Sequence, residues 1–598
     1  MSPRFEPFQQ VVDPIAGSLA VSAVVAALPL LLLFVLLGVF RVRAPKAAIA
    51  SLLLSIVLAI VGWHMPIVQV LSATAQGAFY AIFPILWILI NALWVYKLTV
   101  ATPWFEALGR TIRSISNDLR ILAILVAFCF GALLEALAGF GAPVAISGAM
   151  LMAAGMKPLK SAIVALLANT APVAFGAMAA PIIALNGVTN IPLHDLSSMA
   201  GRQTPFVAVL VPLILVFIVD GKRGVRQTWP VALVSGVVFG VAQFLASNFL
   251  VVELTDVIAA IATVAVVLVM LRFWQPAEIV GMHDVADTDT GSDTDAAEAD
   301  LVGATATGRT GYGTSSGLGG VSRNGQPLPA HAAGAAGSDA AGTGTDTVAR
   351  PPARDVWMAV APYLIIMAVF SIAQLPGVKN WLTAVGSVTF DWPGIDAVDP
   401  SGHQVSAHKF KLDHLKATGT LLLISGIITM ALYRLKPLQG LRIYRDTLFQ
   451  LRWTIVSVTS VLALAFVMNV SGQTNSLGFA LASAGGFFAF LSPLLGWIGV
   501  ALTGSDTSSN SLFGQLQVTA AQQTGLSPVL MAASNSSAGV LGKMLSLQNL
   551  AVASAAVGLD GAESVLFRKL LGWSLGLLAF ITILVLLQST PVLGWMVP

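Results

Sequence analysis

Long apolar runs recur along most of this chain and restrict its fold more than any other feature. Runs near or above the 20 residues that cross a hydrocarbon core occur, for example, at 15–40, around 206–219 and at 257–273. Only 10% of the residues are charged. Because a bilayer interior offers unpaired backbone groups no partner, such runs must be helical. The sequence predicts an all-α, polytopic transmembrane helix bundle of about 14 to 16 segments, some too short to cross alone.

Basic residues set the expected orientation of these segments. Arginine and lysine gather in short loops beside the apolar runs, at 41–46, 110–120, 222–226, 434–452 and 568–569. The positive-inside rule places such loops in the cytoplasm, and alternating spans then put both termini outside. The same placement accounts for the net charge of +3 without a nucleic-acid partner, so the expected surroundings are the lipid bilayer.

One polar stretch divides the chain. Residues 276–354 are rich in Gly, Ala, Thr, Ser and Asp and open with an acidic run, a composition typical of a disordered linker. We expect an N-terminal membrane half at 1–275, a cytoplasmic linker at 276–354 and a C-terminal membrane half at 355–598. A second polar stretch, 376–416, is expected outside.

Each half carries the same order of motifs: a Gly- or Ser-rich stretch, a short Pro-containing stretch, and an Asn followed by Thr or Ser. The first half has AGFGAPV at 138–144, GMKPL at 155–159 and NTAPVAFG at 169–176. The second half has TGSDTSS at 503–509, GLSPV at 525–529 and NSSAGVLG at 535–542. By the basic-loop count these repeats have opposite orientations, an arrangement that supports alternating access in transporters.

Breaks in the middle of an apolar segment are tolerated where they surround a cavity. Half-helices that end there present amide groups and a positive dipole end that suit a carboxylate, and free carbonyls that suit a cation. The pattern therefore predicts two inverted repeats of broken or hairpin helices around an anionic substrate. The plainer interpretation of either motif alone is a kink in a packed helix.

The motif residues also resemble a known family. The stretch FCFGALLEALAGFGAPVAISGAMLMAAGMKPL, then NTAPVAFGAM, LTGSDTSSNSLFGQLQ and NSSAGVLGKMLSLQNLAVASAAVGL, closely resembles the bacterial lactate permease family over nearly the whole chain. Ala136 and Leu137 after Glu135, and NSSAG from Asn535, depart from the family pattern. The resemblance implies a multi-pass inner-membrane symporter that couples the uptake of lactate, and often glycolate, to protons.

Two acidic residues are the candidates for proton coupling. Glu135 lies inside an apolar helix, where an ionisable side chain is costly and points to function; the alternative is a protonated Glu bonded to a neighbouring helix. Asp506 lies in GSDTSSN at a helix break, where it could instead be a capping residue.

The candidates for substrate binding lie beside the same motifs. Lys543 is expected to pair with a substrate carboxylate or with Asp506, unless it extends to the interface. Amide and hydroxyl side chains can donate to a carboxylate, or simply bond between helices. These further candidates are Gly139, Gly141, Asn169, Thr170, Ser505, Thr507, Ser508, Asn535 and Ser536.

Other classes of protein fit the residues less well. GVLGKM, at 539–544, is too short for a phosphate loop and lacks the hydroxyl residue after its lysine, so no ATP site is visible. No nucleophile with its base, and no Cys or His cluster at metal-ligand spacing, indicates an enzyme, a cofactor or a metal. Sodium coupling and an anion channel stay as alternatives, and a homo-oligomer is compatible with the sequence.

The composition of the linker generates the first prediction. Replacing residues 287–340 with a short Gly-Ser segment should leave transport largely intact, because this stretch offers little apolar area to offset the entropy of ordering. Uptake by cells that express the shortened chain, compared at equal membrane abundance, measures the effect. Loss of transport at unchanged abundance would show that the linker has a role of its own.

Overall fold

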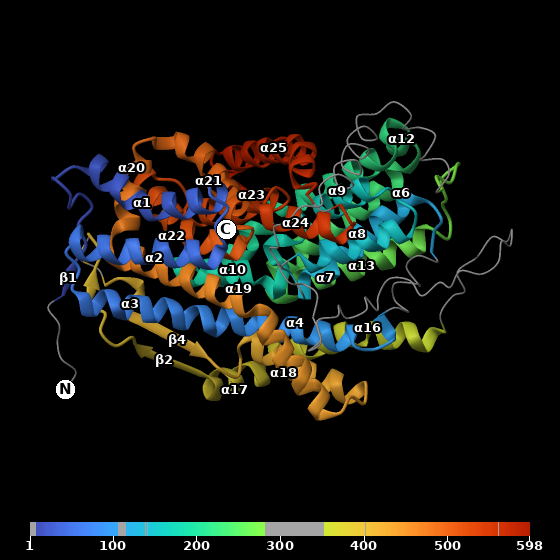
Figure 1. The fold of residues 1–598 in the computed structure, drawn as a ribbon, viewed down its shortest axis with the longest axis horizontal. Helices are drawn as coiled ribbons and strands as arrows, with labels where there is room; N and C mark the ends of the chain where they lie inside the picture. Colours follow the sequence, from blue (N-terminus) through green and yellow to red (C-terminus); the bar gives the residue numbers. More distant parts are fainter. Residues whose placement is uncertain are drawn as a thin grey trace, which may run out of the picture.

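The computed structural model describes residues 7–105, 115–137, 139, 141–281, 352–400, 402, 404–559 and 561–598. It is a bundle of helices, as the sequence predicts, with only short strands (Figure 1). Most of the predicted linker, residues 282–351, lies outside the described residues.

The helices of the first half are α1 (Leu19–Gly38), α2 (Ala44–Val61), α3 (Ile67–Tyr80), η1 (Ala81–Leu86), α4 (Trp87–Val100), α6 (Leu119–Leu122), η2 (Ala123–Phe130), α7 (Gly131–Leu137), α8 (Ala142–Ala153), α9 (Pro158–Ala168), η3 (Val173–Phe175), α10 (Gly176–Thr189), α11 (Leu193–Ala200), α12 (Thr204–Phe249), η4 (Val252–Leu254) and α13 (Thr255–Met270). Those of the second half are α16 (Ala353–Gln374), α17 (Pro376–Gly386), η5 (Ser406–His408), α18 (Thr418–Leu432), α19 (Pro437–Ser471), α20 (Gln473–Ala482), η6 (Gly485–Phe487), α21 (Phe488–Thr503), α22 (Asp506–Thr524), α23 (Pro528–Lys543), α24 (Leu547–Ala556), α25 (Glu563–Gln588) and η7 (Gly594–Met596).

Ten helices in the described part of the chain are long and apolar enough to cross a membrane, or up to eleven with one bent pair. The sequence estimate of 14 to 16 segments was higher for two reasons. It included segments too short to cross alone, and α12, which consists of two arms joined by a turn, counts here as one helix. At Asp220 and Gly221 the backbone of α12 leaves helical geometry, and Gly236 of its second arm lies against the backbone of Val209 in its first. This turn carries one of the predicted basic loops, 222–226.

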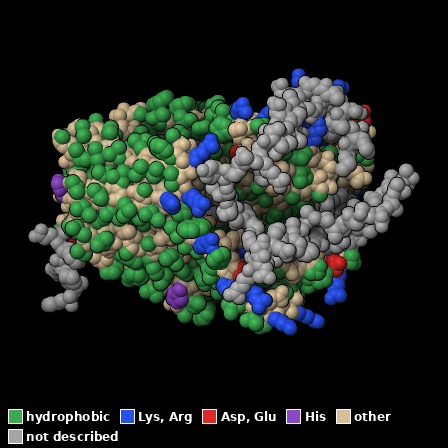
Figure 2. All heavy atoms as spheres, in the orientation of Figure 1, with side chains coloured by type: hydrophobic (Ala, Val, Ile, Leu, Met, Phe, Trp, Pro, Cys, Tyr) green, Lys and Arg blue, Asp and Glu red, His purple; other side chains and the backbone are tan. Residues whose placement is uncertain are grey.

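The two halves of the sequence interleave in space. Helices α2 and α3 pack against α19, α1 packs against α20, and α10 packs against α22, so blue and orange segments lie side by side in Figure 1. In Figure 2, hydrophobic side chains cover the left part of the visible face, and lysine and arginine side chains gather to its right. An outer surface of this kind suits a lipid bilayer.

Three of the four short strands in the described chain occur at 376–416, where the sequence analysis expected an outer polar stretch and no sheet. Strand β2 (Ser387–Asp391) pairs antiparallel with β4 (Lys409–Asp413). Strand β1 (Phe8–Gln9) pairs in parallel with β3 (Ala397–Val398), which ties the beginning of the described chain to its second half. Alternation of Lys and apolar residues in β4 gives one polar and one apolar face, a short-range signal for a strand.

The chain breaks where NTAPVAFG follows α9. Helix α9 and the segment that begins at Val173 are bent by 63° at the break. Pro172 has no amide hydrogen to continue the helix, and Ala177, Met178 and Ala179 adopt left-handed backbone angles. Such angles are costly for residues with a Cβ, so the surrounding packing must hold them.

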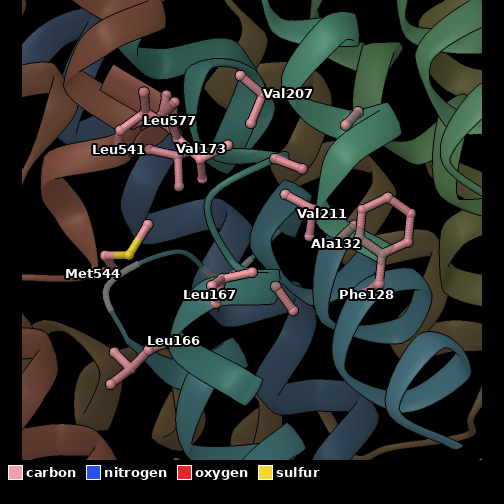
Figure 3. Close-up of a cluster of buried hydrophobic side chains, with 14 of the residues drawn as sticks. Phe128, Ala132, Leu166, Leu167, Val173, Val207, Val211, Leu541, Met544 and Leu577 are labelled. Atoms are coloured by element: carbon pink, nitrogen blue, oxygen red, sulfur yellow. The ribbon is translucent and has the colours of Figure 1, made fainter. Parts of the chain in front are cut away.

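A dry core surrounds this break. Val173 of η3 lies close to Leu541 of α23 and Leu577 of α25, and Met544 lies across from Leu166 of α9 (Figure 3). All of these residues except Leu577, which is 4% exposed, expose 3% or less of their surface. Close packing of these buried side chains holds the broken backbone in place.

A buried arginine links α6 to α12 at one end of the bundle. Arg120 of α6 contacts Asp118 at 2.7 Å and Asp220 of α12 at 3.0 Å, and none of the guanidinium is exposed. It also donates to the backbone carbonyl of Glu278, and the amide of Val280 donates to Asp118. Glu278 and Val280, near the start of the predicted linker, are therefore docked on the bundle.

This cluster generates a prediction about stability. Arg120→Met should destabilise the protein by about 3 to 5 kcal/mol, because it leaves Asp118 and Asp220 buried without their cation. Arg223→Met removes a partly exposed partner of the same Asp220 and should cost under about 1 kcal/mol. Thermal unfolding of both purified variants gives the comparison, and equal losses would contradict the assignment.

Candidate functional site

Glu135 lies on α7, one turn before the chain turns back into α8. Gly139 and Gly141 between these helices have φ angles of +48° and +83°, which favour glycine, and Gly141 is the N-terminal cap of α8. The predicted break at AGFGAPV is therefore present. Because the break ends α7 inside the bundle, the Glu135 side chain is buried, and it lies against the break at NTAPVAFG.

Asn169 contacts Glu135 from the other side of this space. It caps the end of α9, and its side-chain amide donates to Glu135 Oε2 at 2.9 Å. Thr170 is buried beside it, and its hydroxyl donates to the carbonyl of Leu167 in its own helix. The amide nitrogen of Asn169 is thus directed at the carboxylate, while the threonine hydroxyl stabilises the end of α9.

Lys543 completes the cluster from the second half. Its Nζ lies 2.6 Å from Glu135 Oε1, and only 8% and 4% of the two side chains are exposed. The lysine is the last residue of α23, where Gly542 packs on the backbone of Trp497 of α21 with no room for a side chain. The amide of Asn549 donates to the carbonyl of Lys543. The lysine is therefore held on a fixed backbone.

This ion pair differs from the predicted pairing. The sequence analysis offered Asp506 or a substrate as the partner of Lys543, but the structure pairs the lysine with Glu135. Such a pair is strongly coupled, because removing either member leaves an uncompensated charge in a low-dielectric interior at a cost of about 3 to 5 kcal/mol. The two charges also come from opposite halves of the chain, so they join the first break to α23.

Asp506 begins α22 at the second break and lies in a separate hydrogen-bond network. The Ser536 hydroxyl donates to its Oδ2 at 2.5 Å, and Asn510 donates to the same oxygen at 3.4 Å. Asn510 also donates to the carbonyl of Pro181 in α10. Asp506 Oδ1 is buried and has no hydrogen-bond partner in the described chain. One carboxylate oxygen is thus left free toward α23.

The three hydroxyl residues next to Asp506, Ser505, Thr507 and Ser508, differ in their role and in their burial. Ser505 is the N-terminal cap of α22 and accepts from the amide of Ser508, which is the alternative that the sequence left open for this motif. Ser508 is buried and Thr507 is half-buried.

The Asn-Ser motif of the second half is not at a helix break. Asn535 and Ser536 lie in the middle of α23, which is continuous from Pro528 to Lys543. The expectation of a second Asn-containing break was wrong, because NSSAGVLG lacks the proline that interrupts NTAPVAFG. Asn535 instead bonds between helices, donating to Asn510 at 2.9 Å and accepting from Gln517.

The sequence analysis missed four polar residues near these networks. Asn510 and Gln517 lie four and eleven positions after Asp506, a helical spacing that could have been read as one polar face of α22. Asp256 and Gln243 are buried and bonded to each other. Asp256 precedes an apolar run, where it looks like an interfacial flank, and Gln243 is a lone amide inside another apolar run.

The space beside the ion pair is closed. It is lined by Leu166, Asn169, Thr170, Lys543, Met544 and Asn549, and it is too tight for a water molecule. A small carboxylate therefore enters only when the lining moves. Among the described residues, no group of three or more His, Cys, Asp or Glu side chains could hold a metal ion.

Comparison with known proteins gives consistent matches over the whole chain. A family model described as L-lactate permease matches residues 22–306 and 336–592, and the gap between them falls inside the predicted linker. L-lactate permease of Bacillus subtilis is 38% identical over 98% of this chain and 99% of its own length. Glycolate permease GlcA of Escherichia coli is 38% identical over 97% and 98%. The solved structure of MtrF from Neisseria gonorrhoeae has 12% identity and a TM-score of 0.46 over 93% of this chain and 97% of its own.

A glycine next to the ion pair provides a test of its geometry. A Cβ on Gly176 would lie 2.8 Å from Glu135 Oε1 and 3.1 Å from its Cγ, whereas one on Gly131 of α7 would lie 3.7 Å from its nearest neighbour. Gly176→Ala should therefore displace Glu135 and lower stability by about 1 to 3 kcal/mol, and Gly131→Ala should be nearly neutral. Thermal unfolding of the purified variants measures both; an unchanged Gly176→Ala variant would contradict the contact.

Proposed function

The chain belongs to the L-lactate permease family, and on that premise we propose that it carries lactate, or a related short 2-hydroxy monocarboxylate such as glycolate, together with a proton. It is a multi-pass protein of the bacterial inner membrane. The names of its relatives support the two substrates. The proton is our proposal from the charges of the site, and it makes transport a symport.

The observation that carries this proposal is the buried ion pair between Lys543 and Glu135. A substrate carboxylate that binds the lysine takes the place of Glu135 in the pair. Glu135 is then a buried carboxylate without a cation, which costs several kcal/mol unless it accepts a proton. The anion and the proton therefore enter as a neutral pair, and neither is stable in the site without the other.

The amides around the pair suit the rest of a 2-hydroxy acid. Asn169 already donates to a carboxylate, and Asn549 lies beside the lysine with its side chain bonded to Lys543 and Ser546. Uncharged donors of this kind can bind a carboxylate oxygen or a hydroxyl without adding a fixed charge. A site with one lysine and several amides favours a monocarboxylate over a dicarboxylate, whose second charge would find no cation.

Asp506 is the second proposed proton carrier. It is buried, and its direct side-chain partners are Ser536 and Asn510, which are uncharged. Because no described lysine, arginine or histidine lies within ion-pair distance of it, its carboxyl group is stable in the closed protein only when neutral. It lies at the start of α22 against Gly539, one turn before Lys543 on α23, and it can exchange a proton there when the bundle opens.

Labelled lactate uptake into proteoliposomes tests the function directly. Separately imposed pH and sodium gradients distinguish proton coupling from sodium coupling. Counterflow, in which internal unlabelled lactate drives uphill uptake of label, distinguishes a carrier from an anion channel. Accumulation driven by the pH gradient alone is the expected result. Accumulation that requires sodium would overturn the proton assignment and keep the carrier.

The two carboxyl groups generate a prediction about coupling. Glu135→Gln and Asp506→Asn should abolish proton-driven accumulation and retain exchange of lactate for lactate, because an amide imitates a protonated acid in shape and bonding. Uptake under a pH gradient and counterflow, measured on the same preparation, give the two readouts. If both variants accumulate lactate like the parent, the proton is carried elsewhere.

The lysine generates a separate prediction about binding. Lys543→Met removes a charge-assisted contact worth roughly 1.5 to 3 kcal/mol, so affinity for lactate should fall about 10 to 150-fold. Lys436→Met, at an exposed lysine before α19, is the matched control and should bind normally. Equilibrium binding or the KM of counterflow measures the loss. Equal affinity of the two variants would remove Lys543 from the site.

A further inference from the structure

Asp256 is a third buried carboxyl group near the break, outside the cluster described above. It lies in the first turn of α13, and none of its surface is exposed. Its Oδ1 accepts from Gln243 Nε2 at 2.9 Å, and its Oδ2 has no hydrogen-bond partner in the described chain. No described lysine, arginine or histidine lies within ion-pair distance of it.

The helices packed against α13 bring no positive charge to this position. Helix α7 contributes Glu135, the adjoining η4 contributes Glu253, and η2 contributes Cys129. Helix α10 has no titratable side chain. The ionisable residues of α12 are Asp220, Lys222, Arg223 and Arg226, which lie at the turn between its arms, about 25 Å along the helix from Gln243 at 1.5 Å per residue.

Apart from the Arg120 cluster, three carboxyl groups are buried in the described chain, those of Glu135, Asp256 and Asp506. Lys543 is the one buried lysine among the described residues, and it is paired with Glu135. An isolated carboxylate in a dry interior is far too costly to persist. Asp256 therefore holds a proton in this closed conformation, as Asp506 does.

Gln243 connects this carboxyl group to the break. The same Nε2 that donates to Asp256 also lies 3.4 Å from the carbonyl of Ala171, and Oε1 of Gln243 accepts from Thr204. Ala171 lies two residues after Asn169, which donates to Glu135. When Asp256 loses its proton, the carboxylate binds Nε2 more strongly and draws the Gln243 amide toward α13, and the longer contact that the other amide hydrogen makes to Ala171 is the first to weaken.

We propose that Asp256 binds a further exchangeable proton of the transport cycle, in addition to those of Glu135 and Asp506, and positions the broken helix through Gln243. This inference rests on the proposed proton-coupled function. The carboxylic acid forms when Asp256 takes a proton from water in an open conformation, and the closed conformation holds it. A proton is the ligand that we propose, because Asp256 is the one acidic side chain of α13, and the described residues include no group of three or more His, Cys, Asp or Glu side chains that could hold a metal ion.

The test is the number of protons moved per lactate. Asp256→Asn keeps the shape of the side chain and cannot titrate, so the steady-state accumulation ratio should fall about tenfold for each pH unit of imposed gradient, since one proton across one unit is worth about 1.4 kcal/mol. One ionisation should also vanish from the pH profile of uptake, while counterflow at the pH of maximal activity persists. Thr263→Val, two turns along α13 and bonded only to its own helix, is the matched control.

The outcomes separate this inference from the proposed function. If the parent protein fails to accumulate lactate under a pH gradient, the proton-coupled function fails. If the parent accumulates it and a folded Asp256→Asn variant has the same accumulation ratio and pH profile, the inference about Asp256 is overturned. Should Asp256→Asn not fold, Gln243→Met keeps the carboxyl group and removes its link to Ala171. That variant should shift the pH profile, and an unchanged profile would also overturn the inference.

Discussion

The ion pair between Lys543 and Glu135 is the interaction on which the rest of the interior depends. It joins residues 408 positions apart and brings the end of a continuous helix in one half against a broken segment in the other. In a bilayer-spanning bundle, helices gain little from apolar contact with each other, because lipid tails are equally apolar. Buried polar bonds and close backbone packing therefore specify which helices meet. The Lys543–Glu135 pair, with the amides of Asn169 and Asn549, supplies such polar bonds between the two halves.

The broken segment can exist only because its surroundings compensate for it. Three left-handed residues, Ala177 to Ala179, and the lost helical bonds around Pro172 cost free energy that an exposed segment would recover by straightening. Here Asn169 is bonded to Glu135, and Tyr80 donates to the carbonyl of Ile183 further along α10. The strained backbone therefore lies beside Glu135, where a change in the charge of that side chain would act on it.

The sequence was sufficient for the helical class, for the breaks at AGFGAPV and NTAPVAFG, and for singling out Glu135 and Lys543 as charged residues in apolar surroundings, because each of these features interrupts a strong local pattern. It could not pair Lys543 with Glu135 instead of Asp506, since that choice depends on which helices pack together. It also placed Asn535 at a break by analogy with Asn169, although only the first motif contains a proline after the Asn. Asp256 escaped because a carboxylate at the end of an apolar run looks the same whether water or another helix covers it.

The two halves consequently contribute unequal parts to one site. Helix α23 is continuous, and Gly496 and Gly542 bring its backbone against α21 with no space for a Cβ, so Lys543 sits on a rigid support. Glu135 lies on a short helix, α7, that ends two residues before Gly139. Its partner Asn169 is the C-terminal cap of α9, which ends at Ala168. On the carboxylate side, Gly139 and Gly141 after α7 have positive φ angles, whereas on the lysine side α23 ends where it packs against α21. In the cycle that we propose, this difference in packing favours movement of the first half while the substrate stays on the lysine.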